Sequence, residues 1–134
     1  MQIGATLLPL TALRPHERVK ERKVRDSLHI HVRWGNMRRR IVVEHVHGVV
    51  LDGHHRLAVA HRLGLLRVPV VVVEAAKVPV VWRSTSVPID PATVVEAALS
   101  GVLMAPRSTM HDLSMLDVDC DVPLDHLRHP AGWP

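Results

Sequence analysis

Short β-branched runs, separated by polar turns and by segments with helical spacing, dominate the hydrophobic pattern of this chain. One run, 68–74, is nearly all valine, as expected for a strand buried on both faces. His47-Gly48 separates two other runs, and this spacing predicts a hairpin. The strands expected from the whole pattern are 6–10, 41–44, 49–51, 68–74 and 78–82.

Three segments have the spacing of amphipathic helices. The predicted helices are 17–28, 54–63 and a third that begins after Asp90-Pro91 and ends at Gly101. A polar loop is expected at 106–111. Helices and strands alternate without long parallel-sheet crossovers, which indicates a small mixed α/β domain of the α+β class.

The predicted domain occupies residues 1–116. Residues 117–134 are acidic and contain proline, and we expect a loosely packed tail there. Neither a repeat nor a linker divides the chain before this point.

Composition excludes several classes of protein. Hydrophobic residues make up 47% of the 134, so the chain is too apolar to be disordered. No apolar run reaches the roughly 18 residues of a membrane span, and the first ten residues lack the basic region of a signal peptide, so we expect a cytoplasmic protein. The single cysteine, Cys120, excludes an internal disulfide or a multi-cysteine zinc site, and its acidic neighbours argue against a reactive thiol.

Charge is divided unevenly along the chain. Residues 1–62 carry 12 basic and 5 acidic side chains, whereas residues 63–134 carry 5 basic and 8 acidic ones. Basic surface attracts phosphate, either in nucleic acid or in a nucleotide, and arginine suits bidentate phosphate contacts. A GC-rich genome would also favour arginine over lysine, and the composition leaves both explanations open.

The segment 49–57, Val-Val-Leu-Asp-Gly-His-His-Arg-Leu, carries the clearest chemistry. A strand ends at Asp52, and Gly53 allows the backbone to approach a ligand before a helix begins. The first amides of a helix are unpaired and favour phosphate, and Arg56 would add a side-chain donor. Asp52 could hold a metal ion or take a proton. The alternative is an ordinary helix cap with surface side chains around it.

Two further clusters lie on either side of this segment. Pro15-His16-Glu17 precedes the first predicted helix, where a glutamate can simply compensate the helix dipole. Arg107-Ser108-Thr109 and His111 form a cluster that could bind a carboxylate or phosphate, or could be a plain loop. The pairs His29/His31 and His45/His47 would chelate a metal if they lay on strands, but no third ligand is evident and surface histidines are the simpler interpretation.

Taken in order, the three clusters resemble the ParB/sulfiredoxin-like superfamily, in which an Asp-Gly-x-His-Arg segment opens a helix beneath nucleotide phosphates. Residues 6–111 are similar in particular to the free L-serine kinases. That family has Pro-His-Glu near the N-terminus, then Leu-Asp-Gly-x-His-Arg, then Gly-x-Leu-x-Pro-Pro-Lys-x-Thr-x-His. The matching residues here are 15–17, 51–56 and 101–111, with Trp82-Arg83 matching a further Trp-Arg pair. Arg107 stands where the family usually has lysine.

The resemblance implies a small mixed-sheet ParB/sulfiredoxin-like domain with helices packed on the sheet. It also implies a kinase that transfers a phosphoryl group from ATP or ADP to the hydroxyl of free L-serine, or of a close hydroxy amino acid, for a biosynthetic pathway. Glu17 would be the general base, and Asp52 would hold Mg²⁺ or assist proton transfer. The residues implied for the nucleotide phosphates are Gly53, His54, His55 and Arg56, and those for the amino acid are His16, Trp82, Arg107, Ser108, Thr109 and His111.

Two alternative functions belong to the same superfamily. A ParB-like regulator would use a nucleotide to control DNA association, but it needs a helix-turn-helix that the acidic region after residue 75 does not indicate, so nucleic acid is not the expected partner. A sulfiredoxin-like reductase needs a cysteine where this chain has His54-His55. We therefore expect a nucleotide and an amino acid as partners, no membrane, and a valine-rich strand edge as a candidate for homodimerisation.

Overall fold

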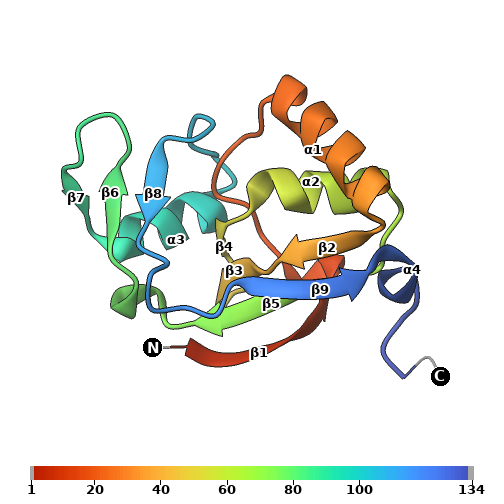
Figure 1. The fold of residues 1–134 in the computed structure, drawn as a ribbon. Coiled ribbons are helices and arrows are strands. Elements are labelled where there is room, and N and C mark those ends of the chain that lie inside the picture. Colours follow the sequence, from red (N-terminus) through yellow and green to blue (C-terminus); the bar gives the residue numbers. More distant parts are fainter. Residues whose placement is uncertain (1, 133–134) are drawn as a thin grey trace.

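A four-stranded mixed sheet organises the computed structural model, which describes residues 2–132 (Figure 1). Its strand order is β1-β5-β3-β4, and β5 is parallel to β3 but antiparallel to β1. The predicted hairpin is present, because β3 and β4 pair antiparallel on either side of His47-Gly48. The strands are β1 (Gln2–Pro9), β3 (Ile41–Glu44), β4 (Val50–Asp52) and β5 (Arg67–Val73). The α+β fold class is confirmed.

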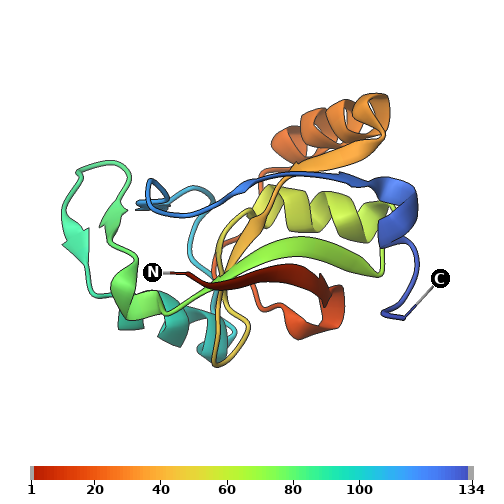
Figure 2. The same ribbon diagram turned by 60° about the horizontal axis from the view of Figure 1, so that its bottom comes forward.

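Alternate residues of the central strands enter two separate hydrophobic cores, one on each face of this sheet. Ile41 and Leu57 belong to the core beneath α2 (His54–Arg62), whereas Val42 and Val94 belong to the core against α3 (Pro91–Ser100). Figure 2 shows α1 (Glu21–Trp34) and α2 on one side of the sheet and α3 on the other. The nearly pure valine sequence of β5 is explained by this two-sided burial.

A second, three-stranded antiparallel sheet lies beside α3. It consists of β7 (Pro88–Ile89), β6 (Val80–Trp82) and β8 (Thr109–His111), with β6 in the middle, and the turn η2 (Ala75–Lys77) leads into it. The expected loop at 106–111 is therefore wrong for its last three residues, which pair with β6. The start of α3 is as predicted, because the Asp90 carboxylate accepts the N–H of Ala92 at 3.0 Å.

The C-terminal segment packs against the rest of the chain. Strand β9 (Asp119–Pro123) pairs with β2 (Asn36–Arg39), and the short helix α4 (Leu124–Leu127) buries Leu124 and Leu127 in the core beneath α2. The expectation of a loosely packed tail is therefore wrong for residues 119–127, because two leucines anchor it. Residues 133–134 of that predicted tail lie outside the described residues.

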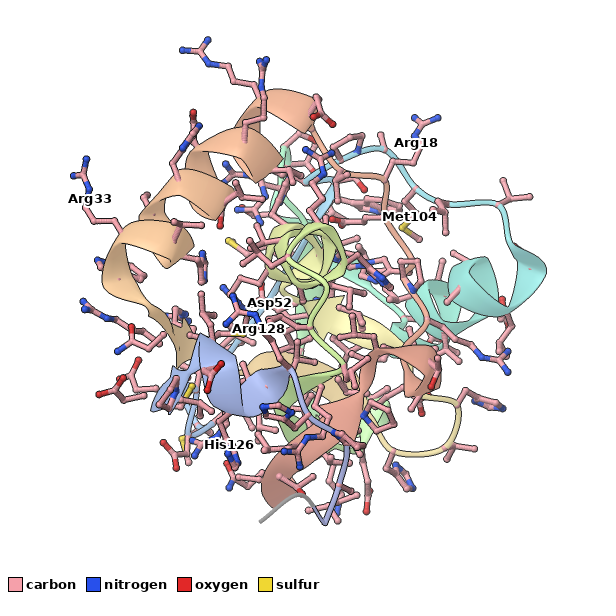
Figure 3. All side chains as sticks on the ribbon, turned by 90° about the vertical axis from the view of Figure 1, so that its right-hand side faces the viewer. Arg18, Arg33, Asp52, Met104, His126 and Arg128 are labelled. Carbon is pink, nitrogen blue, oxygen red and sulfur yellow. The ribbon has the colours of Figure 1, made fainter. Side chains whose placement is uncertain are left out.

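The chain between the turn η1 (Leu10–Ala12) and α1 is extended, so the first helix begins later than predicted. Arg14 exchanges backbone hydrogen bonds with Gly48 and Val50, both at 2.8 Å. Met104 donates to the carbonyl of His16 at 2.8 Å and accepts from the N–H of Arg18 at 2.9 Å. Figure 3 shows Arg18 pointing away from the body of the molecule and Asp52 within its outline. Glu17 therefore lies on a bridging strand-like segment and not in a first helical turn.

No helix within residues 2–132 has the length and hydropathy needed to cross a membrane.

Candidate functional site

A polar pocket of about 250 Å³ lies at the N-terminus of α2 and brings the three sequence clusters together. Of the predicted site residues, it is lined by Glu17, Asp52, residues 53–56, Arg107 and Thr109. Ser27 and Arg83, which received no role from the sequence, also line it.

Gly53 turns the chain from β4 into α2. Its φ of +106° is in the left-handed region, and a Cβ there would lie 2.8 Å from Nη2 of Arg56. No side chain caps the helix at this point, so its first amides stay available to an anion. Residue 53 is thus a glycine because the Arg56 guanidinium lies too close to its backbone to leave room for a side chain.

Asp52 and Arg56 form an ion pair at the edge of the pocket. Nη2 of Arg56 lies 3.1 Å from Oδ2 of Asp52 and also donates to the carbonyl of Arg40 at 3.3 Å. Burial lowers the pKa of Arg56 and the Asp52 charge opposes this change, so the guanidinium remains a cation.

The donor set at Asp52 fits Mg²⁺ held jointly with phosphate. Oδ1 of Asp52 has no hydrogen-bond partner among residues 2–132, and Mg²⁺ is commonly bound by one or two carboxylates with phosphate oxygens and waters. Within the same residues, no group of three or more His, Cys, Asp or Glu side chains could form a metal cage by itself. Asp52 would therefore supply a carboxylate ligand, with phosphate oxygens and waters completing such a site.

His54 fastens the Glu17 segment to α2. Its Nε2 accepts the backbone N–H of His16 at 3.1 Å and that of Glu17 at 3.3 Å, so its proton must be on Nδ1. Burial, with a smaller contribution from His16, lowers the pKa of His54 to about 3. His54 is therefore a neutral acceptor that positions the segment.

His55, the next residue, makes a similar contact with the backbone of the segment that leads into α1. Its Nε2 accepts the N–H of Lys20 at 3.2 Å. Burial lowers the pKa of His55, and the nearby cations Arg107 and Lys23 lower it further. The surroundings of His55 are thus electropositive, as an anion site requires.

Glu17 is buried, with 7% of its surface exposed, and it is held through one carboxylate oxygen. Oε2 accepts the backbone N–H of Thr109 at 2.9 Å and also accepts its hydroxyl. Burial alone would raise the pKa of Glu17, but hydrogen bonds from His16 and Thr109 lower it to about 2. The carboxylate is consequently ionised near pH 7.

His16 and His111 lie behind the pocket wall. His16 has no exposed surface, and its ring contacts the carbonyl of Val50 at 2.6 Å and Oγ1 of Thr109 at 3.0 Å. His111 is also buried, 6.0 Å from His16 between ring centroids, and burial lowers its pKa to about 4. A direct substrate contact does not fit the complete burial of His16, whereas the contact predicted for His111 stays a prediction.

Arg83 holds the loop that carries the last cluster. Its Nε donates to the carbonyl of Arg107 at 3.0 Å, and its Nη2 donates to that of Thr109 at 3.1 Å. Arg107 itself adopts a φ of +55°, which is uncommon for a residue with a side chain. The Trp82-Arg83 pair in the sequence could have drawn attention to Arg83, which was assigned no role.

Trp82 and Ser108 lie near the pocket without lining it. Trp82 is opposite Thr109 in the β6–β8 ladder and is 36% exposed. The Ser108 hydroxyl donates to the carbonyl of Ala105 at 2.8 Å and so stabilises the loop. Their predicted substrate contacts stay predictions.

A second pocket of about 400 Å³ adjoins the first one, between α1, α2 and β2. The two share Ser27, His55 and Arg56. The second pocket adds the aromatic surface of Trp34, over which Arg38 stacks at 4.2 Å.

The paired histidines outside the motifs do not form metal sites. His29 and His31 lie on α1, where residues two apart point in different directions, and Nδ1 of His31 contacts the carbonyl of Ser27 at 2.7 Å. His45 and His47 lie in the turn after β3. Burial raises the pKa of Cys120, in agreement with an unreactive thiol.

No protein-family model matches this sequence, and no curated protein matches it. Solved structures do resemble it. A free serine kinase in complex with AMP is 13% identical, with 95% of each chain covered and a TM-score of 0.76. A conserved hypothetical protein from Pyrococcus furiosus is also 13% identical, with 95% of this chain and 98% of that chain covered and a TM-score of 0.76. SbnI with a C-terminal truncation, from Staphylococcus aureus, is 14% identical, with 92% and 89% covered and a TM-score of 0.77.

At these identities the likeness establishes the fold. The chain adopts the fold of free serine kinase over nearly its whole length, as the resemblance of its motifs predicted.

Proposed function

We propose that this protein is a nucleotide-dependent kinase that phosphorylates the hydroxyl of free L-serine or a close hydroxy amino acid. The observation that carries the proposal is the polar pocket, in which an ionised Glu17, the uncapped start of α2 and three arginines converge. Phosphoryl transfer needs little covalent chemistry from the protein, and depends on positioning and on neutralising charge. The pocket contains the groups for both tasks.

The nucleotide phosphates would bind at the start of α2. Free amides after Gly53 and the positive end of the helix dipole attract an anion, and Arg56 and His55 add donors at the same place. The adjoining pocket beside Trp34 would take the nucleoside, because it shares His55 and Arg56 with the phosphate site. Solved structures of free serine kinase forms in complex with AMP and with ADP support a nucleotide ligand.

The amino acid would be recognised by its carboxylate. Arg107 and Arg83 both line the pocket, and Arg83 fixes the loop that carries Arg107 by donating to two of its carbonyls. Two cations in a small polar pocket favour a free amino acid, which carries a carboxylate, over an alcohol that has no negative charge near its hydroxyl.

Glu17 would accept the proton of the acceptor hydroxyl. In this step the acceptor oxygen forms a bond to the γ-phosphorus of ATP, the bond from that phosphorus to the bridging oxygen breaks, and ADP leaves. With ADP as donor, the terminal phosphoryl group moves in the same way and AMP leaves. Arg56 would neutralise charge on the transferred group. Mg²⁺ at Asp52 would supply additional charge neutralisation for the phosphates.

The test is an acceptor screen with both donors. The protein is incubated with Mg-ATP or Mg-ADP and L-serine, D-serine, L-threonine, L-homoserine or ethanolamine, and products are identified by mass spectrometry. We expect O-phospho-L-serine and little product from ethanolamine, which lacks the carboxylate. Glu17→Gln should abolish this product. Glu21→Gln is the matched control for that variant, because Glu21 lies outside the pocket in an exposed pair with Arg62. Absence of any phosphorylated acceptor, together with nucleotide-dependent binding of duplex DNA, would favour the regulator instead.

A further inference from the structure

The two carboxylate oxygens of Glu17 have different surroundings. Oε2 accepts two hydrogen bonds from Thr109 and lies 3.4 Å from Nε2 of His16. Oε1 makes no hydrogen bond within residues 2–132, and Nδ1 of His54 is 4.0 Å away. Oε2 is therefore fixed by hydrogen bonds, and Oε1 makes only the longer contact with His54.

The direction of each hydrogen bond follows from the atoms that meet. Nδ1 of His16 faces the carbonyl oxygen of Val50 and must donate. A carboxylate only accepts, so the single hydroxyl proton of Thr109 points to Oε2 of Glu17. The Thr109 oxygen then presents only lone pairs to Nε2 of His16, 3.0 Å away. Oε2 of Glu17 thus contacts both residues, because it also lies 3.4 Å from Nε2 of His16.

We propose that His16 and Thr109 are positioning residues that fix Oε2 of Glu17, so that Oε1 alone accepts the proton of the acceptor hydroxyl. The proposal rests on the proposed kinase function for its effect on turnover, but the hydrogen-bond chain needs no substrate. His16 cannot touch a substrate because it has no exposed surface, and the Thr109 hydroxyl is committed to Glu17. Both residues therefore act through the carboxylate.

Two other histidines face His16, and neither is charged near pH 7. His54 faces His16 with ring centroids 4.5 Å apart, and His111 does so at 6.0 Å. Burial lowers the pKa of His54 to about 3 and that of His111 to about 4, so both are neutral near pH 7. Neither of these histidines competes with His16 and Thr109 for Oε2 of Glu17, since His54 faces Oε1 at 4.0 Å.

The first test compares Thr109→Val, which removes the hydroxyl at nearly constant volume, with Thr109→Ser, which keeps it. We expect Thr109→Val to lower kcat by about 10²-fold, the usual effect of a small misplacement of a reacting group, with the KM for nucleotide unchanged. Its acid limb in the kcat–pH profile should move to higher pH, because Glu17 loses a hydrogen bond to its charged form. Thr109→Ser should restore both kcat and the acid limb. A purely structural role for Thr109 would instead lower thermal stability and leave the acid limb in place, and that result would overturn the proposal.

The second test needs no activity. The side-chain carboxyl of Glu17 is titrated by carbon-13 NMR in the free protein, with the resonance assigned through Glu17→Gln. Thr109→Val should raise its pKa from about 2 towards the ordinary value near 4.5, whereas Thr109→Ser should not. If Thr109→Val does not fold, Thr109→Ala removes the same hydroxyl. A Thr109-dependent titration in a protein that phosphorylates no acceptor would support the hydrogen-bond chain and refute the kinase. An active kinase with an unchanged Glu17 titration would refute the positioning role alone.

Discussion

The backbone N–H of Glu17 donates to Nε2 of His54 across 3.3 Å, and the N–H of His16 donates to the same atom. The segment that carries the proposed base is thereby attached to the first turn of α2, where the phosphates are proposed to bind. His54 occupies the variable position of the Asp-Gly-x-His-Arg motif. The relative placement of base and phosphate therefore depends on a residue that the motif itself does not specify.

Removing this acceptor should destabilise the protein. His54→Ala leaves two buried N–H groups unpaired, at about 1–3 kcal/mol for each in the free energy of unfolding. His54→Gln offers an amide oxygen in a similar place and should lose less. Urea unfolding of both variants measures the difference. Equal stability of His54→Ala and the wild type would show that these two hydrogen bonds do not hold the segment.

Acid should weaken the fold in two steps. Burial lowers the pKa of His54 from 6.5 to about 3 and that of His111 to about 4, so below pH 6.5 the unfolded chain binds more protons than the folded one. The free energy of unfolding should fall by at most about 1.4 kcal/mol per pH unit for each of these histidines. Glu17, with a pKa lowered from 4.5 to about 2, adds a further loss between those values.

Urea midpoints between pH 7 and 5 measure the histidine step. The double variant His54→Gln/His111→Gln should flatten this dependence, because its side chains do not titrate. The same slope in the double variant would mean that other groups cause the acid sensitivity.

A methyl group at residue 53 should damage the phosphate site. Gly53→Ala places a Cβ 2.8 Å from Nη2 of Arg56 and imposes a side chain on a φ of +106°. The displaced guanidinium should weaken nucleotide binding in calorimetry. Gly64→Ala is the matched control, because it also has a positive φ, +69°, but its Cβ would meet nothing within 4 Å. Both should lose about 1–2 kcal/mol of stability from the backbone, but only Gly53→Ala should lose affinity. Equal nucleotide affinity of the two variants would show that the close approach of Gly53 and Arg56 is not needed for nucleotide binding.

Replacing Arg107 should affect binding of the amino acid without lowering the stability of the protein. Its φ of +55° suits glycine, so Arg107→Gly should preserve or raise the melting temperature, while the lost cation raises the KM for the amino acid. The KM for nucleotide should change little. Ser86→Gly relieves a comparable φ of +60° outside the pocket and should leave both constants unchanged. A wild-type amino-acid KM in Arg107→Gly would contradict the carboxylate role.

The periodic parts of the fold could be predicted because local pattern and burial agree in them. The β3–β4 hairpin and the doubly buried β5 follow from runs of valine and isoleucine with a turn between them. The C-terminal segment could not be predicted in this way. Its acidic, proline-containing composition hides Leu124 and Leu127, whose burial depends on the distant strand β2. Long-range pairing decided the structure there.

The site shows the same division. Motif resemblance gathered Glu17, Asp52 and Arg107, and the structure places all three on one pocket. The sequence could not distinguish a residue that lines the pocket from one behind its wall, which is why His16 was expected to contact the substrate. Arg83 was overlooked because its two hydrogen bonds reach backbone carbonyls, which leave no trace in a motif.

The central claim is tested most directly by phosphorus-31 NMR of the protein with Mg-ATP or Mg-ADP and L-serine, followed over time. We expect a phosphomonoester resonance of O-phospho-L-serine with the wild type. Glu17→Gln should give no such resonance, although calorimetry should find that it still binds the nucleotide, because the role proposed for Glu17 is to accept the acceptor's proton and not to hold phosphate. A wild-type protein that yields no phosphomonoester with either donor, or a Glu17→Gln variant that yields it at the wild-type rate, would contradict the account.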